Sequence, residues 1–316
     1  MMPEKCSSVR GRFEAIVSFN RQIGPGFYRL GLDFTGEGAN AFAHFEPGQF
    51  AQFDVSNTAL PPLEAVPEHL RDACGRKVLL RRPFSFAQVT AGSKKTAAEL
   101  LYCVVGPATV RMTTLSAGDK LSIIGPLGRG FRIPEGKKTI LLVGGGMGTP
   151  PLQHLAQVLT AKGSGIEILA LAGAKTAKAL PYEGRLDAMS QHLGFSLAEF
   201  AKCGVESLVA TDDGSAGYRG FVTDRLLEWI EQSDAAPDKL MICACGPEAM
   251  LARTAQIAAE KNIDCQVSME QRMACGIGLC QSCAVECRVQ GSTETIYKLC
   301  CEHGPVFDAK EVVFER

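Results

Sequence analysis

The sequence predicts a multidomain β plus α/β protein: an antiparallel β-barrel, a doubly wound parallel sheet and a small cysteine-rich domain. Three observations lead to this fold class. Short apolar segments fill the first part of the chain, strands alternate with helices in the middle, and cysteines gather between 275 and 301. A chain of 316 residues is long enough for two or three domains with cores of their own. We place these domains at 1–136, 137–264 and 265–316.

The first domain is predicted from short segments, many of them alternating apolar with polar residues, that Gly, Pro and Asn separate. Few helical periods interrupt them, which favours a small antiparallel barrel. Between the third and fourth segments, residues 57–77 form a Pro-rich loop with one short helix. The expected strands are FEAIVSFN, GFYRLGLDF, GQFAQFDV, LLYCVVG and DKLSIIGP.

In the second domain the spacing of the apolar residues changes, and helical patterns alternate with strands. The strand KTILLVGGGMG ends in glycines and leads into a helix, TPPLQHLAQVLTAKG, which Thr149 can cap and whose first turn Pro150 can occupy. Because strands and helices alternate from there to residue 264, the pattern predicts a parallel, doubly wound sheet. The further strands are IEILALAGA, VESLVATDDGS and DKLMICACGP, and the helices are FVTDRLLEWIEQ and PEAMLARTAQIAAEK.

A nucleotide site is predicted at one edge of this sheet. GGGMGTPP, residues 144–151, joins a strand to a helix and leaves bare N–H groups for a phosphate. A tight turn alone would explain it, and it is not the G-x-G-x-x-G fingerprint. TDDGSAGYRG and CGPEAM, however, also follow strands of the same sheet, where such folds bind ligands. Three converging segments favour a nucleotide.

The barrel contains a possible anion site in RRPFSF. Arg82 offers a planar fork for a phosphate, Pro83 fixes a turn, and Ser85 supplies a small hydrogen-bonding group. On these residues alone, a strand start with an exposed arginine is the simpler interpretation. GPATVRM, which follows a strand and opens a helix, is a second possible anion site.

The cysteines have the most specific spacing. Cys275-x4-Cys280-x2-Cys283 matches the plant-type iron–sulfur run, which needs one more distant cysteine. Gly276 and Gly278 would let the loop wrap closely around a cluster. Zinc is the alternative, but its sites more often pair two C-x2-C knuckles, and this stretch has one. The spacing therefore predicts a [2Fe–2S] cluster.

Composition excludes several classes of function. The net charge of −1 argues against nucleic-acid binding or a membrane-surface role. No apolar run is long enough for a membrane span, and the N-terminus lacks the apolar core of a signal peptide. Thirteen cysteines without an export signal indicate a reducing, cytoplasmic location. The five histidines are scattered, so we expect no acid–base catalytic residues.

Together these motifs resemble the ferredoxin-reductase-like flavoproteins, in the same order along nearly the whole chain. The C-terminal MACGIGLC…C…GPVF is most similar to the electron-transfer subunits of NAD-dependent dihydroorotate dehydrogenases. The resemblance implies FAD on the barrel, NAD(H) on the α/β domain and [2Fe–2S] at the C-terminus. It also implies a hetero-oligomer with an FMN-bearing catalytic subunit, which oxidises dihydroorotate to orotate in pyrimidine biosynthesis.

The resemblance also implies site residues. Arg82, Pro83, Phe84 and Ser85 would hold the flavin, and Thr109 would belong to a second flavin segment, although Pro107-Ala108 stands where the family usually has a glycine before this threonine. The dinucleotide would lie against Gly145, Gly146, Gly148, Asp212, Gly214, Cys245, Gly246 and Pro247.

The fourth cluster ligand is expected to be Cys301, because it stands where the family's ligand does before Gly304-Pro305. In a strand through TIYKLCC, Cys300 would point to the opposite face and pack as a small apolar residue, and Cys287 would do the same.

Two other functions stay open at this point. One is a subunit of a NAD(P)-dependent ferredoxin or sulfide oxidoreductase. The other is a nucleotide-sensing module whose cysteines bind zinc. The choice between NADH and NADPH is also open, since Lys175 alone is weak support for a 2′-phosphate.

Overall fold

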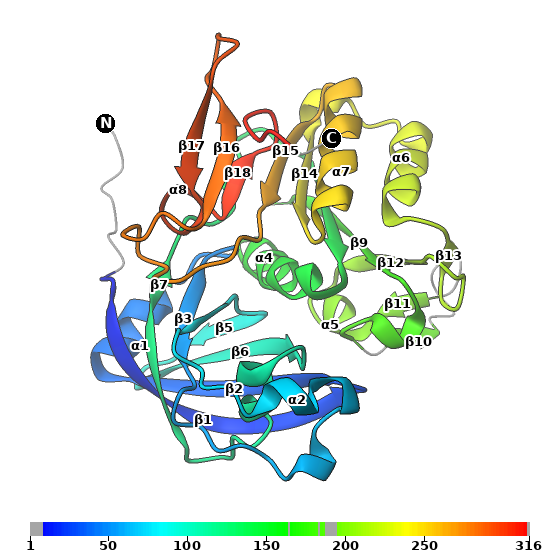
Figure 1. Ribbon diagram of the computed structural model, residues 1–316. Helices are drawn as coiled ribbons and strands as arrows, with labels where there is room; N and C mark the ends of the chain where they lie inside the picture. The colour runs from blue at the N-terminus through cyan, green and yellow to red at the C-terminus, as the bar shows by residue number, and fades with distance from the viewer. Residues whose placement is uncertain (1–8, 164, 183, 187–194, 315–316) are drawn as a thin grey trace.

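The structure of the protein is a computed structural model that describes residues 9–163, 165–182, 184–186 and 195–314. Figure 1 shows an antiparallel barrel in blue and cyan below an α/β domain in green and yellow. A β-hairpin in orange and red stands beside the α/β sheet. The predicted fold class is confirmed.

The first sheet has seven strands, and every neighbouring pair in it is antiparallel. Short helices lie in the connections, including one in the Pro-rich loop, as predicted: α1 (Gly36–Ala43), α2 (Arg71–Cys74) and α3 (Pro107–Met112). Across the sheet the strands are β4 (Arg82–Phe84), β3 (Phe50–Asp54), β7 (Lys120–Leu127), β1 (Gly11–Gly24), β2 (Phe27–Thr35), β6 (Lys95–Cys103) and β5 (Gln88–Ala91).

The sheet curls into a barrel because its two edge strands follow one another in the chain. Only residues 85–87 join β4 to β5, so the edges lie within about 14 Å of each other at this point. Aromatic residues fill the interior, and Phe34 stacks on Phe42 with 4.0 Å between ring centroids. The segment that closes the barrel is the RRPFSF motif.

The second sheet also has seven strands, of which six are parallel. Its order is β13 (Tyr218–Arg219), β12 (Glu206–Thr211), β9 (Glu167–Ala174), β8 (Thr139–Gly145), β14 (Leu240–Cys245), β15 (Asp264–Ser268) and β18 (Val306–Asp308). The helices are α4 (Thr149–Ala161), α5 (Ala198–Ala201), α6 (Val222–Gln232) and α7 (Glu248–Glu260). A two-stranded ribbon is formed by β10 (Gly184–Leu186) and β11 (Phe195–Leu197).

Both faces of this sheet are covered, as the near-continuous apolar strands require. Side chains of α4 and α5 pack on the face that also contacts the barrel. The opposite face packs against α6, α7 and the C-terminal segment. No helix in the described ranges is long and apolar enough to cross a membrane.

The cysteine-rich segment leaves the sheet after β15 and returns to it as β18, which pairs antiparallel with β15. Between them lie a loop, the hairpin of β16 (Ala284–Arg288) and β17 (Thr295–Leu299), and α8 (Cys300–His303). The predicted boundary at 264/265 thus falls at the start of β15, and the division into three domains stays a prediction.

Candidate functional site

The loop between β15 and β16 carries three of the predicted ligands. The backbone N–H groups of Ile277 and Cys280 both donate to the Sγ of Cys275, at 3.5 and 3.4 Å. Such donors stabilise a thiolate and tune the potential of a bound iron–sulfur cluster. The loop is therefore wrapped around the Cys275 sulfur.

Gly276 and Gly278 allow this wrapping. Their φ angles are +70° and +88°, a region that residues with a Cβ rarely adopt. A Cβ on Gly276 would lie 2.3 Å from Nε2 of Gln52, and one on Gly278 would lie 2.6 Å from Oε2 of Glu302. The predicted need for bare backbone at these two positions agrees with this geometry.

Cys283 and Cys301 come together at the open end of the hairpin, just before β16 and just after β17. The N–H of Cys301 donates to the Sγ of Cys283 at 3.4 Å. Cys300 turns elsewhere, and its Sγ donates to the carbonyl of Met269 at 3.3 Å. The expected strand through Cys300 and Cys301 is wrong, because β17 ends at Leu299 and both cysteines lie on α8.

The protonation of the cysteines differs across the loop. A hydrogen bond with the Ser282 hydroxyl, at 3.2 Å, and N–H donors lower the pKa of exposed Cys280 to about 6. Burial, followed by the neighbouring Cys283 thiol, raises the pKa of Cys301 to about 12. Metal binding by Cys301 would therefore release a proton.

The hydrogen-bond donors of the cysteine loop fit a [2Fe–2S] cluster. A [2Fe–2S] cluster needs two pairs of sulfurs, one pair for each iron. The N–H donors at Cys275 and Cys283 supply polar contacts on both sides of the loop.

On the barrel, two neighbouring arginines do different things. Arg81 is tied into the sheet, where its Nη2 donates to Asp54 at 3.2 Å and to the Ser122 hydroxyl at 3.0 Å. Half-buried Arg82 donates through Nη1 to the carbonyls of Leu80 and Arg81. Within the described part of the chain, its other guanidinium N–H groups have no protein acceptor, so they are available to an anion.

The rest of the predicted flavin segment lies on and after β4. Pro83 and Phe84 are half-buried within the strand, and Ser85 follows it where the barrel closes. Thr109 is different, because its hydroxyl accepts from the N–H groups of Val105 and Gly106 at the start of α3. Its side chain therefore holds that helix start in place.

The predicted nucleotide loops pack directly on each other. A Cβ on Gly148 would lie 2.1 Å from the carbonyl oxygen of Cys245, and one on Gly145 would lie 2.7 Å from Pro247. Gly146 and Gly246 have positive φ angles of 51° and 155°. A Cβ would clash at Gly145, Gly148 and Gly246, whereas Gly146 requires glycine because of its positive φ.

Asp212 and Gly214 follow β12, two strands away from β8, at the same carboxyl edge of the sheet. The three predicted segments thus converge on one edge, as expected for a nucleotide site. Burial raises the pKa of the Cys245 thiol to about 12, so this thiol stays neutral at pH 7.

The start of α4 corrects one expectation. Pro150 lies in the first turn as predicted, but Thr149 is the first residue of the helix and Gly148 is the cap. The Oγ1 of Thr149 is buried and has no hydrogen-bond partner in the described structure. This hydroxyl lies against Gly144 at the end of β8.

Sequence reasoning missed two buried polar groups. Gln52 is fully buried under the cysteine loop, although the only signal was a polar residue inside GQFAQFDV. Arg29 in the barrel pairs with Glu199 of α5 at 3.3 Å, a contact between distant segments that the sequence alone did not indicate.

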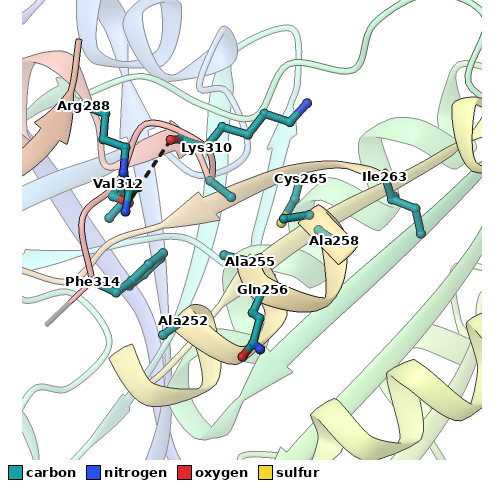
Figure 2. A pocket seen from close by; sticks show the side chains of 12 residues that line it. Ala252, Ala255, Gln256, Ala258, Ile263, Cys265, Arg288, Lys310, Val312 and Phe314 are labelled. Atoms are coloured by element: carbon teal, nitrogen blue, oxygen red, sulfur yellow. Dashed lines mark hydrogen bonds between the residues drawn. The ribbon is translucent and has the colours of Figure 1, made fainter. Parts of the chain in front are cut away.

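A cavity of about 430 Å³ lies elsewhere, between α7 and the C-terminal segment. Figure 2 shows alanines of the helix opposite Phe314. Arg288, at its edge, donates to the carbonyl of Val312 at 2.6 Å. None of the predicted site residues lines this cavity.

Family models match the two segments that contain the cysteine loop and the first glycine loop. Residues 270–313 match the family model for the iron–sulfur cluster binding domain of dihydroorotate dehydrogenase B, and residues 142–256 match the oxidoreductase NAD-binding domain. A curated protein of Caldanaerobacter subterraneus subsp. tengcongensis is 33% identical, covering 97% of this chain and 100% of its own length. One of Geobacillus thermodenitrificans is 37% identical over 96% of this chain and 99% of its own. Both are named dihydroorotate dehydrogenase B (NAD(+)), electron transfer subunit.

Solved structures share the fold. A NADH-dependent reduced ferredoxin-NADP oxidoreductase, studied for flavin-based electron bifurcation, superposes with a TM-score of 0.70 at 24% identity, covering 95% of this chain and 90% of that one. A ferredoxin NADP+ reductase from Neisseria gonorrhoeae with bound FAD and NADP gives 0.55 at 15% identity, covering 79% and 91%.

Proposed function

The chain belongs to the family of electron-transfer subunits of NAD-dependent dihydroorotate dehydrogenase B, and from this we propose how its residues carry electrons between NAD and a partner. It is an oxidoreductase subunit, and the cofactors that fit it are FAD, a [2Fe–2S] cluster and NAD(H). The observation that carries the proposal is the cysteine loop, where backbone N–H groups already point at two of the sulfurs.

The proposed cluster ligands are Cys275, Cys280, Cys283 and Cys301. The first three share one loop, and the N–H of Cys301 contacts the Cys283 sulfur. Cys300 is left out because its thiol is committed to the carbonyl of Met269.

The proposed flavin contacts are Arg82, Pro83, Phe84 and Ser85. Free N–H groups of Arg82 suit a phosphate, since an arginine forms charge-assisted hydrogen bonds to phosphate oxygens. Ser85, at the closing point of the barrel, would contact the ring. Thr109 would act on the flavin through the shape of the α3 start, because its hydroxyl is already bonded there.

The proposed dinucleotide site is the edge where β8, β12 and β14 end. Gly145 and Gly148 let the first loop pack on the second, and at Gly146 nothing lies within 4 Å of the place of a Cβ, so a dinucleotide could approach the backbone there. The other contacts would be Asp212, Gly214, Cys245, Gly246 and Pro247. The Cys245 thiol at this edge is neutral, so it would add no charge of its own beside the nicotinamide ring.

Bound FAD would exchange a hydride with nicotinamide and single electrons with the cluster. The chain's own residues would hold these groups in order. The glycine loops would hold the dinucleotide, the β4 motif would hold the flavin, and the cysteine loop, which packs on Gln52 of the barrel, would hold the cluster. No side chain need exchange a proton with a substrate here.

The partner we propose is the FMN-bearing subunit that oxidises dihydroorotate, working with this chain in the cytoplasm. Ile277 and Leu279, on the cysteine loop, are 44% and 78% exposed. Apolar side chains exposed beside a redox centre suit a docking surface, where a partner would cover them.

Reconstitution tests the proposal. The purified chain should reduce an artificial dye with NADH but should not oxidise dihydroorotate, and the cognate FMN subunit should couple the two reactions. Cys280→Ser should abolish the coupling and keep NADH oxidation with dye, whereas Cys287→Ala, outside the loop, should keep both.

Two outcomes would contradict it. Turnover of dihydroorotate by this chain alone would refute the division of labour. A reconstituted pair that reduces dyes but never couples dihydroorotate to NAD would instead favour a ferredoxin oxidoreductase.

A further inference from the structure

Gln52 is the polar side chain that the proposed function leaves unexplained. It lies in β3 and is fully buried, with 0% of its surface exposed. Neither its Nε2 nor its Oε1 has a hydrogen-bond partner in the described structure. Buried amides nearly always have partners, so this group indicates a ligand that binds beside it.

The alternation of β3 places this amide on the outer face of the barrel. Ala51 and Phe53 point into the barrel core. Phe50, on the same side of the strand as Gln52, belongs instead to the core that contains Cys283 and Cys301. Gln52 therefore faces the cysteine segment.

The contact itself is with the cysteine loop. A Cβ on Gly276 would lie 2.3 Å from Nε2 of Gln52 and 2.7 Å from its Cγ, so the bare Cα of Gly276 lies directly on the amide. Gly276 follows Cys275, whose sulfur already accepts two backbone N–H groups. The amide thus approaches the loop next to a proposed ligand.

The same strand is adjacent to the flavin motif. In the β3–β4 ladder Gln52 pairs with Pro83 of RRPFSF. The side chain of Gln52 contacts the cysteine loop, while its backbone is in register with the proposed flavin segment.

We infer that Gln52 is a hydrogen-bond donor to the bound cluster, through its Nε2–H, on the side of Cys275. This inference rests on the proposed [2Fe–2S] cluster. Sulfides and thiolates accept such bonds, and reduction adds negative charge to them, so a donor stabilises the reduced form and raises the reduction potential. Gln52 would favour the passage of electrons onto the cluster.

A second glutamine supplies a matched control. Gln49 is also buried, but its Nε2 donates to the carbonyl of Gly128 at 3.0 Å, and its Oε1 accepts from the N–H of Glu46 at 2.8 Å. Both polar atoms of its amide thus have hydrogen-bond partners within the barrel. Replacing it should disturb packing without removing a donor to the cluster.

The test is a redox titration of the whole chain, with the cluster followed by EPR and the flavin by absorbance. In Gln52→Met the ratio of reduced to oxidised cluster at a fixed potential should fall about tenfold, the equivalent of one hydrogen bond to a charged group. The flavin potential should stay unchanged, and Gln49→Met should shift neither.

Gln52→Asn covers the case in which Gln52→Met does not fold. It keeps an amide but shortens the side chain by one methylene, and the same negative shift of the cluster potential is expected. An unchanged cluster potential in folded, iron-loaded variants, or a shift confined to the flavin, would overturn the inference. Absence of a [2Fe–2S] signal in the unsubstituted protein would instead overturn the proposed function.

Discussion

Cys300 and Cys301 are adjacent on α8, yet their sulfurs have different surroundings. Cys301 lies against the Cys283 thiol, while Cys300 donates to Met269. Cys301→Ser should therefore lose most of its iron, because serine replaces a thiolate ligand. Cys300→Ser should retain it. Iron and acid-labile sulfide analysis, together with the visible spectrum, checks both, and the opposite pattern would reassign the fourth ligand.

Arg82 and Arg81 look equivalent in the sequence, but both Nη atoms of Arg81 are bonded within the sheet, whereas Arg82 uses only Nη1. Arg82→Ala should weaken flavin binding by about 1.5–3 kcal/mol, the value of a hydrogen bond to a charged group, with little change in iron. Flavin fluorescence released after dialysis measures the loss. Exposed Arg132, with 73% of its side chain accessible, gives the control Arg132→Ala. Full flavin retention by Arg82→Ala would remove Arg82 from the phosphate site.

The cysteine spacing could be predicted from the sequence because a loop of fixed length sets the distance between its ligands. Gln52 could not, because its importance depends on Gly276, more than two hundred positions away in the chain. For the same reason the sequence could not show that the Thr109 hydroxyl is already bonded at the start of α3.

At the scale of elements, α4 carries a buried titratable group against the barrel. His154 stacks on Phe45 with ring centroids 6.0 Å apart, and burial lowers its pKa from 6.5 to about 4. Between these values the unfolded chain binds more protons than the folded one. The free energy of unfolding therefore decreases as pH falls from 6.5 to 4, by about 3 kcal/mol at pH 4.

Thermal or urea unfolding at several pH values checks this expectation. Between pH 6.5 and 4, the free energy of unfolding of His154→Leu should change less with pH than that of the unsubstituted protein. Equal slopes for the two proteins would show that His154 is not the group responsible.

The longer strands and helices of the first two predicted domains follow from local periodicity, and most of these were predicted. The expectations that were wrong or missing concern segments whose conformation depends on contacts with distant parts of the chain. TIYKLCC has the composition of a strand, but its last two residues start α8 because Cys301 meets Cys283 there. VFD forms β18 only because β15 offers a free edge, which no local pattern shows.

At the scale of the molecule, an ion pair joins the barrel to the α/β domain. Arg29 of β2 is 6% exposed and contacts Glu99 of β6 at 3.2 Å and Glu199 of α5 at 3.3 Å. Arg29→Met would leave Glu199 buried without a partner, at a cost of about 3–5 kcal/mol.

Urea unfolding of the purified variants measures this cost. Adding Glu199→Gln to Arg29→Met should recover a large part of the loss, because the unpaired charge is then gone. A double variant as unstable as the single one would show that packing, not charge, is what Arg29 contributes.

The pairing of Ser268 with Val306 means that the cysteine segment begins and ends at neighbouring points of one sheet. If oxygen destroys the cluster, the segment can loosen while β15 and β18 stay in register and the glycine loops keep their shape. A chain damaged in this way would still consume NADH, but it would no longer deliver or receive electrons through its partner. We therefore expect oxidative damage to abolish electron transfer to the partner while NADH oxidation continues.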